Sequence, residues 1–245
     1  DLPSQKDFVY EVKYDGFRAV LKWDKQHIRL ISRNQKDLTH QFPEIIDFCQ
    51  ENQALVESLL PLTLDGELVI LNHRYQANFS LIQKRGRLKN SEKIELEASE
   101  RPATFLAFDL IQLNGIDYTN KEFEERKKRL QALFHEAEIE DSIQPALVNV
   151  KWFHNPNDLE RIIFEYKGEG IVAKRKKSYY QSGKNHRDWL KIKNWRSIQG
   201  FLTEYDPKNG YFTVSVFDHE DIVNIGKCKH GLDDESLSAL KQLFI

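Results

Sequence analysis

The segment Glu11–Arg18, with the sequence EVKYDGFR, gathers a lysine, an arginine, two carboxylates and a glycine in one short stretch. A lysine attacks an electrophile only as the free amine, and a neighbouring cation, a bound metal or partial burial favours that form. Because Arg18 follows Lys13 closely, Lys13 is a candidate nucleophile. The alternative is a surface lysine paired with Asp15, and this motif alone does not decide between the two.

Five further motifs follow along the chain, each combining charged or aromatic residues with apolar neighbours. In order they are Ser32-Arg33-Asn34, Leu64–Val69 (LDGELV), Phe105–Asp109 (FLAFD), Glu169–Lys174 (EGIVAK) and Trp189–Lys193 (WLKIK). This ordered series resembles that of the covalent nucleotidyltransferase superfamily. Within it the chain is similar to ATP-dependent DNA ligases, specifically to the ligase module of bacterial ligase D, over roughly residues 8–230.

The resemblance implies that Lys13 forms a covalent lysyl-AMP phosphoramidate with ATP. It also implies that Arg18 and Arg33 contact the sugar and phosphates, a role that suits the forked donors of guanidinium groups. Glu11 is implied to read the adenine amino group. Lys174, the last residue of EGIVAK, is expected to belong to the same nucleotide site.

Phe108 is implied to stack on the adenine ring, with Ile171 or Val172 closing the opposite face. An aromatic plane and a branched aliphatic chain form a slot that suits a flat base. The alternative is that all three are core residues. Lys191 and Lys193 alternate with Ile192, so both ammonium groups share a strand face and are expected to neutralise the α-phosphate in the transition state.

A divalent metal is expected at Glu67 and Glu169, and Glu67 is also implied to accept from a ribose hydroxyl. Carboxylates and phosphate oxygens suit a hard cation, so Mg²⁺ or Mn²⁺ is expected in place of zinc. The two cysteines, Cys49 and Cys228, cannot supply a four-cysteine zinc site. This counts against the zinc-containing NAD-dependent ligases and favours ATP as the donor. Asp65 receives no role.

The elements that must position these residues mix strands and helices without regular alternation. Strands are predicted over 8–13, 17–23, 27–31, 64–71, 104–113 and 170–174, and helical spacing covers 42–60. Thr119 and Glu122 form a capping-box pattern ahead of a second helix. We therefore predict an α+β fold, with an antiparallel-sheet nucleotidyltransferase (adenylation) domain over residues 1–196.

Residues 197–245 predict a small β domain. Residues 200–205 and 211–217 alternate around an Asp206–Gly210 turn, which is typical of a β-hairpin. The resemblance implies an OB-fold domain, but the segment is short for a closed five-stranded barrel, so we expect an incomplete one. No arginine follows Arg196, so the family's C-terminal basic motif is missing, and we expect a shortened chain.

The formal net charge is −2, but the charge is unevenly distributed. Residues 167–196 contain ten Lys and Arg against two acids, with Tyr179, Tyr180, Trp189 and Trp195 interleaved. Such a run can be an ordinary solvated surface, yet aromatic residues among cations favour a phosphate-bearing partner. Nicked or broken double-stranded DNA is the expected substrate, and the resemblance adds Ku and a polymerase module as expected partners.

Hydrophobic content of 40% and charged content of 30% indicate a folded chain, and no apolar run reaches the length of a membrane span. We expect a cytoplasmic protein without a membrane partner. Two alternatives to a DNA ligase stay open. One is an RNA ligase or a GTP-using capping enzyme, which shares the lysine chemistry. The other is a non-catalytic nucleic-acid-binding module.

Overall fold

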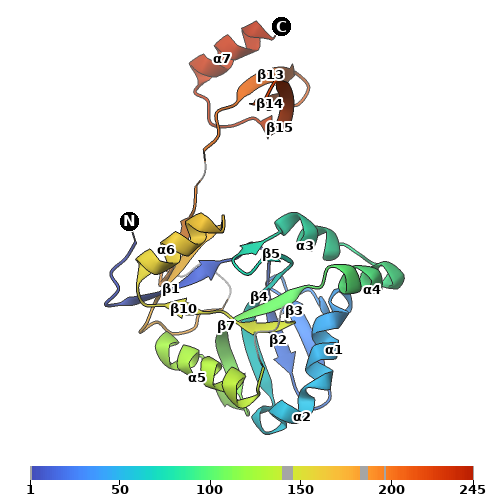
Figure 1. The fold of residues 1–245 in the computed structure, drawn as a ribbon, viewed down its shortest axis with the longest axis vertical. Coiled ribbons are helices and arrows are strands. Elements are labelled where there is room, and N and C mark those ends of the chain that lie inside the picture. The colour runs from blue at the N-terminus through green and yellow to red at the C-terminus, as the bar shows by residue number, and fades with distance from the viewer. Residues whose placement is uncertain (1, 140–145, 183–186, 196, 245) are drawn as a thin grey trace. The chain divides into compact units, whose positions relative to one another are not determined.

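The computed structural model describes residues 2–139, 146–182, 187–195 and 197–244 (Figure 1). The chain forms two compact units, Asp1–Asn194 and Trp195–Ile245. Each unit has its own sheet structure and is described by itself. In the described residues, no helix combines the length and the apolar character needed to cross a membrane.

A six-stranded sheet forms the larger part of the first unit. Its main path runs β3-β2-β4-β7-β8, and the short β9 pairs with β7 in parallel. The strands are β2 (Phe17–Trp23), β3 (Ile28–Ser32), β4 (Leu62–Val69), β7 (Thr104–Leu113), β8 (Ile116–Asp117) and β9 (Leu147–Asn149). The 17–23 and 104–113 predictions agree with β2 and β7, so the predicted strands that carry Arg18 and Phe108 are confirmed.

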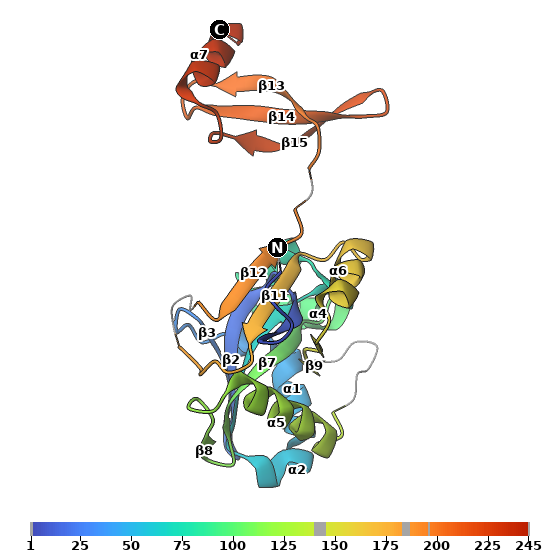
Figure 2. The same ribbon diagram turned by 90° about the vertical axis from the view of Figure 1, so that its left-hand side faces the viewer.

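A four-stranded antiparallel sheet lies beside it, in the order β10-β1-β11-β12. These strands are β10 (Trp152–Phe153), β1 (Phe8–Lys13), β11 (Gly170–Arg175) and β12 (Trp189–Lys193). Figure 2 shows β11 next to β12 and α6 (Pro156–Glu165) nearby. The register pairs Lys13 with Gly170 and Val172 with Lys191, so motifs distant in sequence become neighbours.

Gly170 is required where β11 meets β12. Its φ is +153°, and a Cβ at this position would lie 2.1 Å from the carbonyl oxygen of Ile192. A larger residue would therefore push β11, which pairs with Lys13, away from β12, which carries Lys191.

Two hydrophobic cores hold the helices against the sheets. The main core takes apolar residues from α1 (Pro43–Glu51), α2 (Gln53–Val56), α3 (Phe79–Arg85) and α5 (Phe123–Glu136). The second core packs α6 on β1 and β11 through Leu159 and Ile163. Of the predicted 42–60 helix, α1 and α2 form with a short 3₁₀ turn at Glu57–Leu59, whereas α3, α4 (Ser91–Glu100) and α6 were not predicted.

The predicted capping box at Thr119 is wrong. Helix α5 begins at Phe123, and its N-cap residue, Glu122, makes no side-chain capping bond. The backbone N–H of Thr119 instead donates to Asp117 Oδ1 at 2.8 Å. The first amides of α5 donate to the carbonyls of Ser178 and Lys176, at 2.8 Å for Phe123 and 3.0 Å for Glu124. A distant backbone segment therefore satisfies this helix end.

Two remaining short strands, β5 (Leu71–His73) and β6 (Gln76–Ala77), form a hairpin, and Thr39–Gln41 forms a 3₁₀ turn. The second unit contains an antiparallel meander of β13 (Phe201–Asp206), β14 (Tyr211–Asp218) and β15 (Asp221–Cys228), followed by α7 (Asp234–Leu243). The predicted 200–217 hairpin is confirmed by the pairing of β13 with β14. Phe212 is buried and meets Phe244 at 5.9 Å between ring centroids.

Candidate active site

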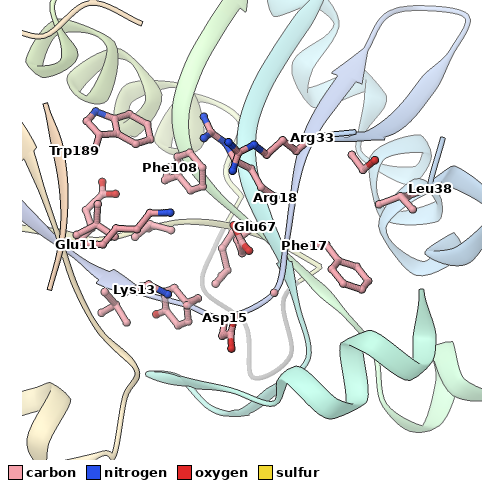
Figure 3. Close-up of a pocket in the computed structure, with 18 of the residues that line it drawn as sticks. Glu11, Lys13, Asp15, Phe17, Arg18, Arg33, Leu38, Glu67, Phe108 and Trp189 are labelled. Atoms are coloured by element: carbon pink, nitrogen blue, oxygen red, sulfur yellow. The ribbon is translucent and has the colours of Figure 1, made fainter. Parts of the chain in front are cut away.

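A cavity of about 780 Å³ opens in the first unit where the two sheets meet (Figure 3). Side chains from both sheets line it, and most of the residues predicted from the motifs are among them. These lining residues are Glu11, Lys13, Arg18, Arg33, Glu67, Phe108, Val172, Lys174 and Lys191. The volume falls within the range of small-ligand pockets.

Lys13 ends β1, and its Nζ forms an ion pair with Glu169 Oε1. The Lys13 side chain is 13% exposed, so it lines the cavity from a largely buried position. The alternative partner considered for Lys13, Asp15, also lines the cavity, but the ion pair goes to Glu169. The predicted nucleophile and a predicted metal ligand are therefore paired, although only Lys13 of the two lines the cavity.

The surroundings of the two predicted metal carboxylates suit a bound cation. Burial, followed by the neighbouring charge of Asp65, raises the pKa of Glu67 to about 8, and nearby cations offset only part of this shift. Glu169 Oε2 is buried and has no hydrogen-bond partner among the described residues. Within that same part of the chain, no cluster of three or more Asp, Glu, His or Cys exists, so phosphate oxygens and water would complete the coordination.

Arg18 is held by a residue to which the sequence assigned no role. Its Nε and a terminal nitrogen donate to Asp65 Oδ1 and Oδ2 at 3.1 and 2.6 Å. The hydroxyl of Tyr180 donates to the same Oδ2 at 2.9 Å. Asp65 is fully buried on β4, two register pairs from the Arg18–Glu67 pair. The fork of Arg18 is thereby fixed toward the cavity, where Figure 3 shows it beside Arg33.

The predicted base slot has an aromatic wall with two rings. Phe108 and Trp189 meet edge to face, with centroids 5.6 Å apart and planes at 84°, and both line the cavity. The sequence places Trp189 in the WLKIK motif and in the basic run, but gave it no role in the base slot.

Ile171 is a correction to the predicted slot. Only Val172 of the two candidates lines the cavity, whereas Ile171 packs in the second core with Leu159 and Ile163. Successive strand residues point to opposite faces, so only one of them can face the base.

Beneath the slot lies a buried group of charges around Glu11. Lys127 Nζ is 2.7 Å from Glu11 Oε1, and Lys174 Nζ is 2.5 Å from Glu11 Oε2. Lys174 Nζ also lies 4.4 Å from the Phe108 centroid and 4.1 Å from the Trp189 ring, and burial lowers its pKa. Lys127 comes from α5, and the sequence motifs did not indicate it.

A second buried ion pair ties α5 to β7. Arg126 donates from Nε and a terminal nitrogen to the two oxygens of Asp109, each at 2.7 Å, and both side chains are fully buried. Burial raises the pKa of Asp109 more than the Arg126 charge lowers it. Asp109 directly follows Phe108, so the bridge anchors the strand that carries the stacking ring.

The two β12 lysines are placed differently. Lys191 lines the cavity, and burial, followed by the charge of Lys13, lowers its pKa. Lys193 lies on the same strand face but pairs with Gly170, two residues further along, and does not line the cavity. The predicted shared strand face is present, but only Lys191 contacts this cavity.

The 167–196 run is not a uniform basic face. Lys174 is buried, and Arg175 pairs with Asp188 at 2.8 Å. Tyr179 and Trp195 are exposed. Lys184 and Arg196 lie outside the described residues. Of the aromatic residues of this run, Trp189 lines the cavity, whereas Tyr179 and Trp195 lie at the surface.

Residues 3–193 match the family described as the ATP dependent DNA ligase domain. The chain belongs to this family. The match spans every motif and every residue that lines the cavity. The predicted family, that of ATP-dependent DNA ligase domains, and the α+β fold class are confirmed.

Relatives of this ligase-domain chain include end-joining proteins. The "Bifunctional non-homologous end joining protein LigD" of Bacillus subtilis is 38% identical over 245 residues, covering 98% of this chain and 40% of that protein. "DNA ligase C2" of Mycolicibacterium smegmatis is 31% identical over 201 residues, covering 80% and 52%. The chain thus spans about half, or less, of the length of these curated relatives.

A solved structure of "mycobacterial DNA ligase D complexed with ATP and MES" matches with a TM-score of 0.62 at 25% identity. The match covers 97% of this chain and 71% of that one. The fold of this ligase-domain chain is therefore that of a ligase D structure that holds ATP.

Proposed function

We propose that Lys13 attacks the α-phosphorus of ATP. A nitrogen–phosphorus bond forms, the bond from the α-phosphorus to the bridging oxygen breaks, pyrophosphate leaves, and the amine proton passes to solvent. The observation that carries this proposal is the convergence of Lys13, Arg18 and Phe108 on one cavity from three strands. Lysine supplies the nucleophile, guanidinium groups hold phosphate or ribose oxygens, and the aromatic ring holds the base.

The AMP group then passes to the 5′-phosphate of a DNA nick, and the 3′-hydroxyl displaces AMP to seal the strand. We assign Lys191 and Arg33 to the phosphates, with Lys193 joining them once substrate is bound. Glu11 reads the base, and Glu67 accepts from the ribose. Similarity to proteins named for non-homologous end joining supports broken duplex DNA as the substrate. On this proposal the protein works at cytoplasmic, nucleoid-associated DNA with a Ku-type end-binding protein and a polymerase module as partners.

Glu67 and Glu169 are proposed to hold Mg²⁺ or Mn²⁺. The donor set fits because both groups are carboxylates, Glu67 is half-buried with a raised pKa, and one oxygen of Glu169 has no hydrogen-bond partner among the described residues. When bound, the cation would neutralise charge on the phosphate oxygens. A cation near Glu169 would also compete with Lys13 for that carboxylate and so favour release of the ammonium group from its ion pair.

The domain assignment completes the proposal. We propose that residues 1–196 are the adenylation domain and that residues 197–245 are part of an OB-fold domain that grips DNA. The antiparallel β13–β15 meander, with register shifts in both pairings, supports a curved β domain.

Intact-mass spectrometry after incubation with ATP and Mg²⁺ tests the first transfer directly. We expect an AMP adduct that is absent from Lys13→Ala, and GTP as a parallel donor tests the capping-enzyme alternative. A DNA nick already carrying 5′-AMP tests sealing independently of adduct formation, and a matched RNA nick tests the RNA-ligase alternative. If the chain forms no adduct and seals no nick, the alternative of a non-catalytic nucleic-acid-binding module is favoured.

A further inference from the structure

Lys127 is a fully buried lysine that lies below the base slot and outside every motif of the sequence. It extends from α5 to β1, where its Nζ lies 2.7 Å from Glu11 Oε1. The same ammonium group donates to the carbonyl of Val150 at 2.5 Å and to Asn149 Oδ1 at 3.2 Å. Lys127 thereby joins the helix, the strand that carries Glu11 and the C-terminal end of β9.

Glu11 is held from two sides. Lys127 meets one carboxylate oxygen and Lys174 meets the other, so both oxygens have a fixed cationic neighbour. The carboxylate is 2% exposed, and at this depth a misplaced or uncompensated charge is strongly unfavourable. Lys174 is itself packed among Phe108, Phe123 and Trp189. Two anchored cations therefore leave the Glu11 side chain one favourable orientation.

We infer that Lys127 is a positioning residue that sets base selection by this site through Glu11. A carboxylate is an acceptor only, so it pairs with the exocyclic amine of adenine and repels the carbonyl oxygen that guanine carries at the same place. Discrimination needs that acceptor to be held in one place, because a mobile carboxylate can turn away from the wrong base. The inference rests on the proposed function, in which Glu11 faces the base.

A merely structural role for Lys127 makes a different prediction. Loss of packing in α5 would weaken use of every nucleotide alike. Loss of Glu11 positioning would instead weaken the use of only that nucleotide which offers a hydrogen-bond donor to the carboxylate. Purine riboside triphosphate is the matched probe, because it has the size and stacking surface of ATP but lacks the 6-amino group. The ratio of kcat/KM for the two triphosphates in adduct formation therefore isolates the positioning effect.

The experiment compares Lys127→Met with the unmodified chain, using intact mass to follow adduct formation. We expect the unmodified chain to prefer ATP over purine riboside triphosphate about tenfold or more, the scale of one hydrogen bond to a charged group. In Lys127→Met that preference should fall to within about twofold. The loss should appear as a higher KM for ATP, with kcat little changed and purine riboside triphosphate use nearly constant.

Two control variants lie on the same helix. Leu133→Ala removes a buried side chain of the main core, so it should lower stability and keep the ATP preference. Lys128→Met removes an exposed lysine that pairs with Glu124, so it should change neither quantity. If Lys127→Met fails to fold, Lys127→Gln carries the same test, because the shorter amide side chain removes the charge but keeps a hydrogen-bond donor.

Glu11→Gln completes a double-mutant cycle. If Lys127 acts through Glu11, adding Lys127→Met to Glu11→Gln should change the preference no further. A Lys127 variant that keeps the full ATP preference, or equal losses with both triphosphates, overturns the inference and leaves the proposed function intact. Failure of the unmodified chain to form any adduct removes the proposed function, and this inference falls with it.

Discussion

Replacement of Arg126 by methionine should destabilise the first unit more than any other single charge removal on α5. Methionine keeps much of the side-chain length but removes the guanidinium group. Asp109 would then lose both 2.7 Å hydrogen bonds while staying fully buried. The carbonyls of Lys121 and Ser178 would lose donors at 2.6 and 3.1 Å.

The expected loss in free energy of unfolding is about 3–5 kcal/mol, the scale for removing one partner of a buried ion pair. Most of it comes from the stranded Asp109 carboxylate. Arg129→Met is the matched control on the same helix, because Arg129 pairs with Glu136 at the surface. That control should cost about 0–1 kcal/mol.

The loss should also depend on pH, and the sign follows from Asp109. Burial raises its pKa in the folded chain above the value in the unfolded chain. A group with a raised folded pKa binds more protons when folded, so stability falls as pH rises from the unfolded pKa through the folded pKa. Removal of Arg126 raises the Asp109 pKa further. Arg126→Met should therefore lose the least free energy of unfolding at a pH near the ordinary pKa of a carboxyl group. It should lose more as the pH rises toward neutral.

Urea unfolding followed by tryptophan fluorescence measures this loss. Trp23, Trp152 and Trp189 belong to the first unit and only Trp195 to the second, so the signal reports mainly on the first. Asp109→Asn added to Arg126→Met should recover part of the lost stability, because it removes the stranded charge. A loss below about 1 kcal/mol, or strictly additive effects in this cycle, would refute the buried-pair reasoning.

Four further predictions concern the cavity and the thiols. Lys13→Ala should abolish the AMP adduct without shifting the unfolding midpoint, whereas Lys191→Ala should slow adduct formation about a hundredfold in single-turnover measurements; a normal rate would make Lys191 a surface cation. Asp65→Asn should raise the KM for ATP about tenfold by loosening the adjacent arginine, and an unchanged KM would count against that positioning. Burial raises the pKa of the Cys49 thiol and so disfavours its thiolate, so at pH 8 a thiol reagent should label Cys228 quickly and Cys49 only after unfolding; equal labelling rates would contradict this.

Much of the candidate site could be predicted from the chain because each motif ends or occupies a strand. The alternation of β1 places Glu11 and Lys13 on one face. The Asp206–Gly210 turn likewise predicts the β13–β14 hairpin from local residues alone. The predicted cavity residues lie on short local patterns, whose side-chain directions follow from strand geometry. Local periodicity also indicates the strands that carry Arg18 and Phe108.

The residues that hold the cavity side chains in place could not be predicted in the same way, because their contacts depend on how segments distant in the sequence pack together. Nothing local distinguishes the buried Lys127 of α5 from the exposed lysine that follows it. The pairing of β1 with β11 and the packing of α6 decide that Val172 faces the cavity while Ile171 enters a core. Sequence by itself therefore determined which chemical groups this ligase domain carries. Only the tertiary structure decided which charges hold them in place, because a buried charge takes its partner from whichever segment packs against it.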